Sequence, residues 1–212
     1  CGALLCAHWV TFFIAVKVGG VAVGTLGFAC FPAFVAILEG LLYREKLSSA
    51  EYVLILLVTI GLVLVTPSFN FENSATEGLL WGILSGLIYA ILALANRHSA
   101  SSVNGTQVCW WQNLAVIVLL FPFTYHELPL VSAMDWMWIA CLGLICTGLA
   151  YSLFISSLQA LKARIAAMII ALEPVYAILI AWALFHEVPS LRMVSGGLLI
   201  IFAVAWSARR RS

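Results

Sequence analysis

The sequence predicts an all-α, polytopic membrane helix bundle, and three observations lead to this fold class. Hydrophobic residues make up 64% of the 212 residues and charged residues only 9%, whereas soluble domains carry about half and about a quarter. The apolar residues gather into runs long enough to cross a bilayer, which takes about 20 helical residues. Several runs contain Gly and Pro, which membrane helices tolerate better than soluble ones.

Eight apolar runs follow one another along the chain. In order, we expect membrane-spanning helices at Gly2–Val18, Val21–Tyr43, Tyr52–Pro67, Gly78–Ala95, Gln107–Tyr125, Trp136–Leu161, Ile165–Phe185 and Met193–Ala208. Short polar segments separate them, and most charged residues of the chain lie in these segments or at the ends of the runs. In chain order these residues include Lys17, Arg44 and Lys46, Glu72 and Glu77, Arg97, Glu127 and Asp135, Lys162 and Arg164, and Arg192.

The distribution of Lys and Arg predicts the orientation of the chain. If Arg209–Arg211 lies in the cytoplasm, eight of the ten basic residues fall on the cytoplasmic side. Only Lys17 and Arg192 fall outside. Because cytoplasmic loops are enriched in basic residues, we expect Cys1 and the C-terminus to be cytoplasmic. The net charge of +1 gives no reason to expect a nucleic-acid partner.

The sequence predicts no metal site and no cofactor. Its six cysteines lie in apolar runs without CxxC spacing and are interpreted as small hydrophobic residues. His126-Glu127 and His186-Glu187 do not complete an HExxH motif, and both lie at the ends of runs. No GxxxxGK[ST] loop is present, so ATP is not expected to drive the protein directly.

An internal repeat relates the two ends of the chain. The segment from Phe31 (FPAFVAILEGLLYREKLS) matches the segment from Glu173 (EPVYAILIAWALFHEVPS) without gaps at an offset of 142 residues (174 − 32 and 187 − 45). The same offset relates Phe12 to Phe154 and places Trp9 opposite Tyr151. The predicted topology puts the two copies on opposite sides of the membrane. Inverted repeats of this kind are typical of secondary transporters.

The repeat is incomplete at its first end. Residues 78–212 form a repeat of five helices, residues 1–67 form one of three helices, and residues 68–77 are an external linker. At the same offset, the repeat equivalents of the helices Gly78–Ala95 and Gln107–Tyr125 would begin near residue −64 (78 − 142), before the first residue of this sequence. We therefore expect the chain to hold the last eight helices of a ten-helix, five-plus-five protein.

The doubled motif Pro-x12-Glu-x2-Ser resembles the EamA-type branch of the drug/metabolite transporter superfamily. The two copies are Pro32/Glu45/Ser48 and Pro174/Glu187/Ser190, the second in its LEP form. The resemblance implies a ten-helix exporter or permease for amino acids, other metabolites or drugs, in a bacterial-type inner membrane. It marks Glu45 and Glu187 as a signature, although their place at helix ends favours capping or loop pairing over solute binding.

Glu173 is the first candidate for a functional residue. It is the ninth of 21 residues in Ile165–Phe185, a run that is otherwise uncharged and about 31 Å long as a helix, so it lies near the bilayer midplane. Ionisable groups at that depth mark solute pathways or proton relays; a structural carboxyl bonded between helices is the alternative. Pro174 is expected to bend this helix, and Pro32 its counterpart.

Other polar side chains within the runs are candidates for the same pathway, because each needs a hydrogen-bond partner inside the membrane. They are Gln159, Tyr151, Gln112, Asn113, Tyr89 and His8. Gln159 also continues a stripe with Gly148, Ser152 and Ser156, which is typical of close helix packing. The pattern Gly82–Gly86 predicts a second packing face.

These features predict a multi-pass secondary transporter that moves a small organic solute, most simply by export, through alternating access. Its partners would be the solute and the lipid bilayer, and a homodimer is left open. Two alternatives remain. An integral membrane enzyme would require His, Asp, Ser or Cys clustered at one depth on neighbouring helices. A nontransporting membrane scaffold would require no central pathway.

Overall fold

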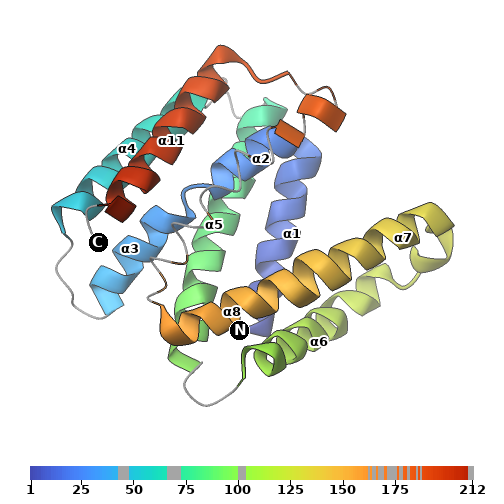
Figure 1. Ribbon diagram of the computed structural model, residues 1–212. Coiled ribbons are helices and arrows are strands. Elements are labelled where there is room, and N and C mark those ends of the chain that lie inside the picture. Colours follow the sequence, from blue (N-terminus) through green and yellow to red (C-terminus); the bar gives the residue numbers. More distant parts are fainter. Residues whose placement is uncertain are drawn as a thin grey trace.

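The computed structural model describes residues 1–42, 48–65, 73–99, 104–161 and 188–209, together with positions 163, 166, 170, 176, 179, 180, 182–184 and 186. Every element among them is helical, which confirms the predicted all-α class (Figure 1). The elements are α1 (Gly2–Gly19), α2 (Val21–Phe28), α3 (Phe31–Leu42), α4 (Ser49–Val65), α5 (Ser74–Ser99), α6 (Gly105–Thr124), the 3-10 turn η1 (Leu128–Leu130), α7 (Ala133–Cys141), the π-helical segment η2 (Leu142–Leu149), α8 (Ala150–Ala160) and α11 (Leu191–Arg209).

The chain is a polytopic membrane protein. Within the described residues, the segments long and apolar enough to cross a membrane are Gly2–Gly19, Val21–Leu42, Ser74–His98, Gly105–Thr124 and Ala133–Gln159. Shorter apolar stretches lie in α4 and α11, at Tyr52–Gly61 and Leu191–Ala203. The expected span Ile165–Phe185 falls largely outside the described residues.

The second expected span, Val21–Tyr43, is bent rather than straight. Gly20, at φ 85°, separates α1 from α2 in a conformation that favours glycine. α2 then ends at Phe28 and α3 begins at Phe31. Pro32 lies in the first turn of α3, where a missing N–H costs no helical hydrogen bond. The break between the two helices lies just before Pro32, and the role of Pro32 in bending the span stays a prediction.

α5 lies in the middle of the bundle, with α3 on one side and α1 on the other (Figure 1), and it contacts α1, α2, α3 and α8. Glycines at four-residue spacing form its contact face, as the pattern Gly82–Gly86 predicted. A Cβ built on Gly78 would lie 2.5 Å from Cα of Gly19, and one on Gly82 would lie 2.6 Å from the carbonyl oxygen of Gly24. The backbones approach this closely because the helices carry no side chains there.

α5 is also longer than the expected span Gly78–Ala95. It continues through Ser99, so Asn96 and Arg97 are helical residues rather than loop residues. The prediction that Arg97 lies in a loop was wrong, because buried partners described below hold this last turn of the helix.

The final expected helix, Met193–Ala208, is α11, and it runs antiparallel to α4 (Figure 1). The two helices pack tightly, since a Cβ on Gly61 of α4 would meet the Ile200 side chain at 2.5 Å. Ser190 of the doubled motif accepts a hydrogen bond from the Met193 N–H at 3.2 Å and so caps α11. α4 and α11 begin at Ser49 and Leu191, 142 residues apart (191 − 49).

The main apolar core lies where α1, the α2–α3 bend, α5, α6 and α8 meet. Leu5, Phe31, Leu92 and Ile155 are buried there almost completely. Along one side of this core, α7, η2 and α8 follow one another as a nearly continuous helix (Figure 1). The π-helical segment in the middle of this helix has no buried residue and borders the cavity described below.

Candidate functional site

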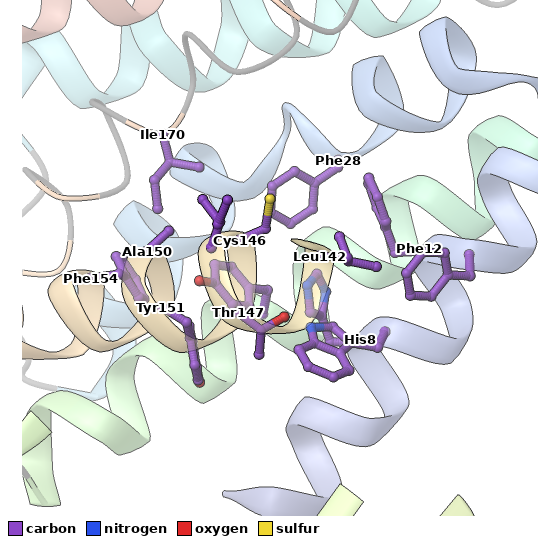
Figure 2. A pocket seen from close by; sticks show the side chains of 14 residues that line it. His8, Phe12, Phe28, Leu142, Cys146, Thr147, Ala150, Tyr151, Phe154 and Ile170 are labelled. Atoms are coloured by element: carbon purple, nitrogen blue, oxygen red, sulfur yellow. The ribbon is translucent and has the colours of Figure 1, made fainter. Parts of the chain in front are cut away.

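A cavity of about 500 Å³ opens between α1, α2, α5, η2 and α8. Its size is within the range of small-molecule sites. Its lining is mostly aromatic and aliphatic (Figure 2) and consists of His8, Trp9, Phe12, Phe13, Phe28, Tyr89, Leu142, Ile145, Cys146, Thr147, Ala150, Tyr151, Phe154 and Ile170.

Aromatic rings pack around Tyr89, at the centre of the lining. Its ring centroid lies 4.5 Å from that of His8, 5.5 Å from that of Phe154 and 5.6 Å from that of Phe28. These separations are within the range of favourable ring contacts. Because the rings come from α1, α2, α5 and α8, the cavity wall depends on the packing of all four helices.

His8 is tied to α5 through Ser85, and both side chains are buried. Its Nδ1 lies 2.8 Å from Ser85 Oγ and 3.3 Å from the Ser85 carbonyl oxygen. Ser85 Oγ in turn donates to the His8 carbonyl oxygen at 3.1 Å. The ring edge at Nδ1 is thereby held against α5.

Three amide and hydroxyl side chains form a closed hydrogen-bonded triangle across α5, α6 and α8. Tyr151 Oη donates to Gln112 Oε1 at 2.7 Å, Gln112 Nε2 donates to Asn96 Oδ1 at 2.6 Å, and Asn96 Nδ2 donates to Tyr151 Oη at 3.2 Å. All three are buried. Mutual pairing removes most of the cost of placing these groups in an apolar interior. The triangle also fixes the Tyr151 ring in the cavity wall.

An ion pair joins α3 to α5 at Arg97, the residue that follows Asn96 of the triangle. Arg97 Nη1 lies 2.5 Å from Glu39 Oε1. The Glu39 side chain is 0% exposed and that of Arg97 28%. A carboxylate so deeply buried in an apolar bundle requires a cation. Asn96 and Arg97 therefore connect the end of α5 to helices on both of its sides.

The π-helical segment η2 supplies Leu142, Ile145, Cys146 and Thr147 to the lining. The wider turn changes which residues face the core, and π-helical turns occur frequently at functional sites. The sequence analysis expected an ordinary helix across Trp136–Leu161 and missed this feature, for which the residues give no periodic signal.

Three of the candidates from the sequence line the cavity together: His8, Tyr89 and Tyr151. Gln112 is one hydrogen bond away from it, through Tyr151. Asn113 donates instead to the carbonyl oxygen and sulfur of Cys109, on its own helix.

Gln159 is exposed and does not line the cavity. In its stripe, Ser156 packs closely, since a Cβ on Gly105 would lie 2.4 Å from Ser156 Oγ. The candidates Glu173, Pro174, Glu45 and Glu187 lie outside the described residues.

Asn96 and Glu39 were not among the predicted site residues. Both could have been found from the sequence, because each is a polar residue within or beside an apolar run. Glu173 was selected on the same ground. Glu39 lies in the run FPAFVAILEGLLY, where a buried carboxylate implies a partner.

The offset of 142 residues recurs in the cavity itself. Eight of the 14 lining residues form four pairs with this separation (150 − 8, 151 − 9, 154 − 12 and 170 − 28). The pairs are His8 with Ala150, Trp9 with Tyr151, Phe12 with Phe154, and Phe28 with Ile170. Positions separated by the offset of the predicted repeat thus line the same cavity.

Residues 76–209 match the model of the EamA-like transporter family. The chain belongs to the EamA-like transporter family. As a member of this family within the drug/metabolite transporter superfamily, it is a multi-pass transporter, as its fold and its doubled motif predicted.

Relatives of the family extend across the chain. A Bacillus subtilis (strain 168) protein named uncharacterized transporter YxxF is 27% identical over 218 residues, covering 100% of this chain and 69% of that protein. The pseudopaline exporter CntI of Pseudomonas aeruginosa is 21% identical, over 81% of this chain and 60% of that protein. One crystal structure of a protein matches with a TM-score of 0.72 and 22% identity, covering 98% of this chain and 75% of the other, and supports the fold.

Proposed function

We propose that this EamA-like transporter is a secondary transporter, and that the aromatic cavity is its solute site. The supporting observation is that four pairs of repeat-related residues line one space, since inverted-repeat transporters bind solute between their repeats. In this proposal residues 1–67 and 78–212 belong to two repeats joined by 68–77. An experimental structure relating the halves by an axis along the membrane normal would contradict the inversion.

Alternating access makes a direct prediction for Ala150, which lines the cavity. In a variant without native cysteines, Ala150→Cys should react with a membrane-impermeant methanethiosulfonate applied to either face of the membrane, because each state opens the cavity to one side. The measurement is the labelling rate in right-side-out and inside-out vesicles.

Leu153→Cys is the matched control for this experiment. Leu153 is on the same helix, is 61% exposed and does not line the cavity, so it should face lipid and remain unlabelled. Labelling of Ala150→Cys from one face alone would show that the cavity opens to one side of the membrane only, and it would contradict alternating access.

The orientation in the membrane belongs to the same proposal, with the C-terminus in the cytoplasm of a bacterial cell and the inner membrane as location. Single cysteines introduced at Asn70 and at Asn104 should therefore react with impermeant reagent from opposite faces. Labelling of both from one face would contradict the predicted topology. Outward transport is the proposed direction, in keeping with the name of the relative CntI.

Glu173 is proposed as the proton-carrying group. Glu173→Gln keeps the shape and most of the hydrogen bonding but removes the titrating carboxyl, so it should flatten the pH dependence of transport without preventing membrane insertion. Pro174→Ala should slow turnover and leave the pH profile unchanged. The measurement is solute flux in proteoliposomes between pH 5.5 and 8.5. An unaltered profile in Glu173→Gln would show that the coupling group is elsewhere.

A further inference from the structure

We propose that the cavity takes an aromatic amine, whose N–H group donates to His8 Nε2 while its ring lies against the aromatic wall. This inference rests on the proposed function, because it assumes that the cavity binds the solute. It adds the chemical class of that solute, which follows from the groups that the wall presents.

The contacts of His8 select one tautomer. The Ser85 hydroxyl has a single proton, and its contact with the His8 carbonyl oxygen uses that proton. Nδ1–H can then donate to Ser85 Oγ at 2.8 Å and to the Ser85 carbonyl oxygen at 3.3 Å. This assignment satisfies all three contacts. A proton on Nε2 would instead leave Nδ1 and the His8 carbonyl oxygen competing for the one hydroxyl proton, and would set the Nδ1 lone pair against the Ser85 carbonyl oxygen. Nδ1 therefore carries the proton, and the Nε2 lone pair is left for the cavity.

The rest of the wall is also electron-rich. Tyr89, Phe28 and Phe154 line the same cavity as His8, and the last two rings pack against Tyr89. The faces of aromatic rings carry partial negative charge. A cation over such faces gains about 0.5–2 kcal/mol for each good contact. An ammonium group thus finds both an acceptor and several rings in this cavity.

Among the described residues of the wall, no side chain offers a positive charge to an anionic group. The described lining residues include no Lys or Arg. In the sequence, every Lys and Arg lies in the last turn of a predicted span or outside the spans. Arg97 is held by Glu39. A carboxylate entering the cavity would lose its hydration without a cation to replace it, so the zwitterionic amino acid should be rejected where the amine is accepted.

Four compounds with the same indole ring test this class: tryptamine, indole, tryptophan and indole-3-acetate. Binding is measured as protection of Ala150→Cys against the methanethiosulfonate reagent in purified protein. We expect tryptamine to protect at the lowest concentration, and tryptophan and indole-3-acetate to require at least about tenfold more. Equal protection by tryptophan, or protection by none of the four, would overturn the inference.

Two further measurements separate the inference from the proposed function. His8→Leu should weaken protection by tryptamine about tenfold, as expected for one lost hydrogen bond to a charged donor, and should reduce the difference between tryptamine and tryptophan. Protection by tryptamine unchanged in His8→Leu would contradict the role of Nε2. If Ala150→Cys reacts from both membrane faces and tryptophan protects best, the transporter mechanism stands and only the solute class is wrong.

Discussion

Replacing Arg97 by Met is expected to lower the free energy of unfolding by about 3–5 kcal/mol, because it removes the cation from a buried pair. Glu39 is 0% exposed and lies 2.5 Å from the guanidinium. Methionine fills much of the arginine volume but removes the cation that lies against the buried carboxylate. The measurement is equilibrium unfolding in detergent micelles.

Two variants decide whether the charge is the cause. Arg192→Met removes a cation from the exposed first turn of α11, and should change stability by less than about 0.5 kcal/mol. Glu39→Gln combined with Arg97→Met should recover most of the loss, because no buried charge remains. A single Arg97→Met variant as stable as Arg192→Met would show that the ion pair contributes nothing to the fold.

The helices were predictable because each depends on residues close together in the sequence. An apolar run between charged residues defines a membrane helix whatever its neighbours are. The close approach of α5 to α2 was predictable for the same reason, since Gly82 and Gly86 lie on one face. The residues at which the helices end were less predictable. α5 continues to Ser99, and Asn96 and Arg97 in its last turns bond to residues of other helices.

The polar partners could not be predicted, because they depend on how helices cross. His8, Tyr89 and Tyr151 were recognisable as polar groups in apolar runs, and the cavity brings them together. Gln112 bonds to Asn96 of α5, whereas the adjacent Asn113 bonds within α6. Which of the two amides faces α5 depends on how α6 is rotated about its own axis. Sequence periodicity shows which broad side of a helix is apolar, but it does not show which residue on that side contacts a given neighbouring helix.

Replacing Gln112 by Leu is expected to break the triangle that holds Tyr151. The substitution leaves the Tyr151 hydroxyl and the Asn96 amide each short of one buried partner. At about 1–3 kcal/mol for each of the two unsatisfied groups, the free energy of unfolding should fall by about 2–6 kcal/mol. Since the Tyr151 ring lines the cavity, KM for the solute should also rise. Unfolding in micelles and flux in proteoliposomes measure the two effects.

Asn113→Leu is the matched control. It removes the amide of the next residue along the chain, whose described hydrogen bonds go to Cys109 on the same helix. It should affect stability less than Gln112→Leu does and leave KM nearly unchanged. Tyr151→Phe provides the decisive comparison. Gln112→Leu and Tyr151→Phe remove the same hydrogen bond, so the double variant should lose less stability than the two losses added together. Strict additivity would mean that the two side chains act independently and that the triangle does not position the cavity wall.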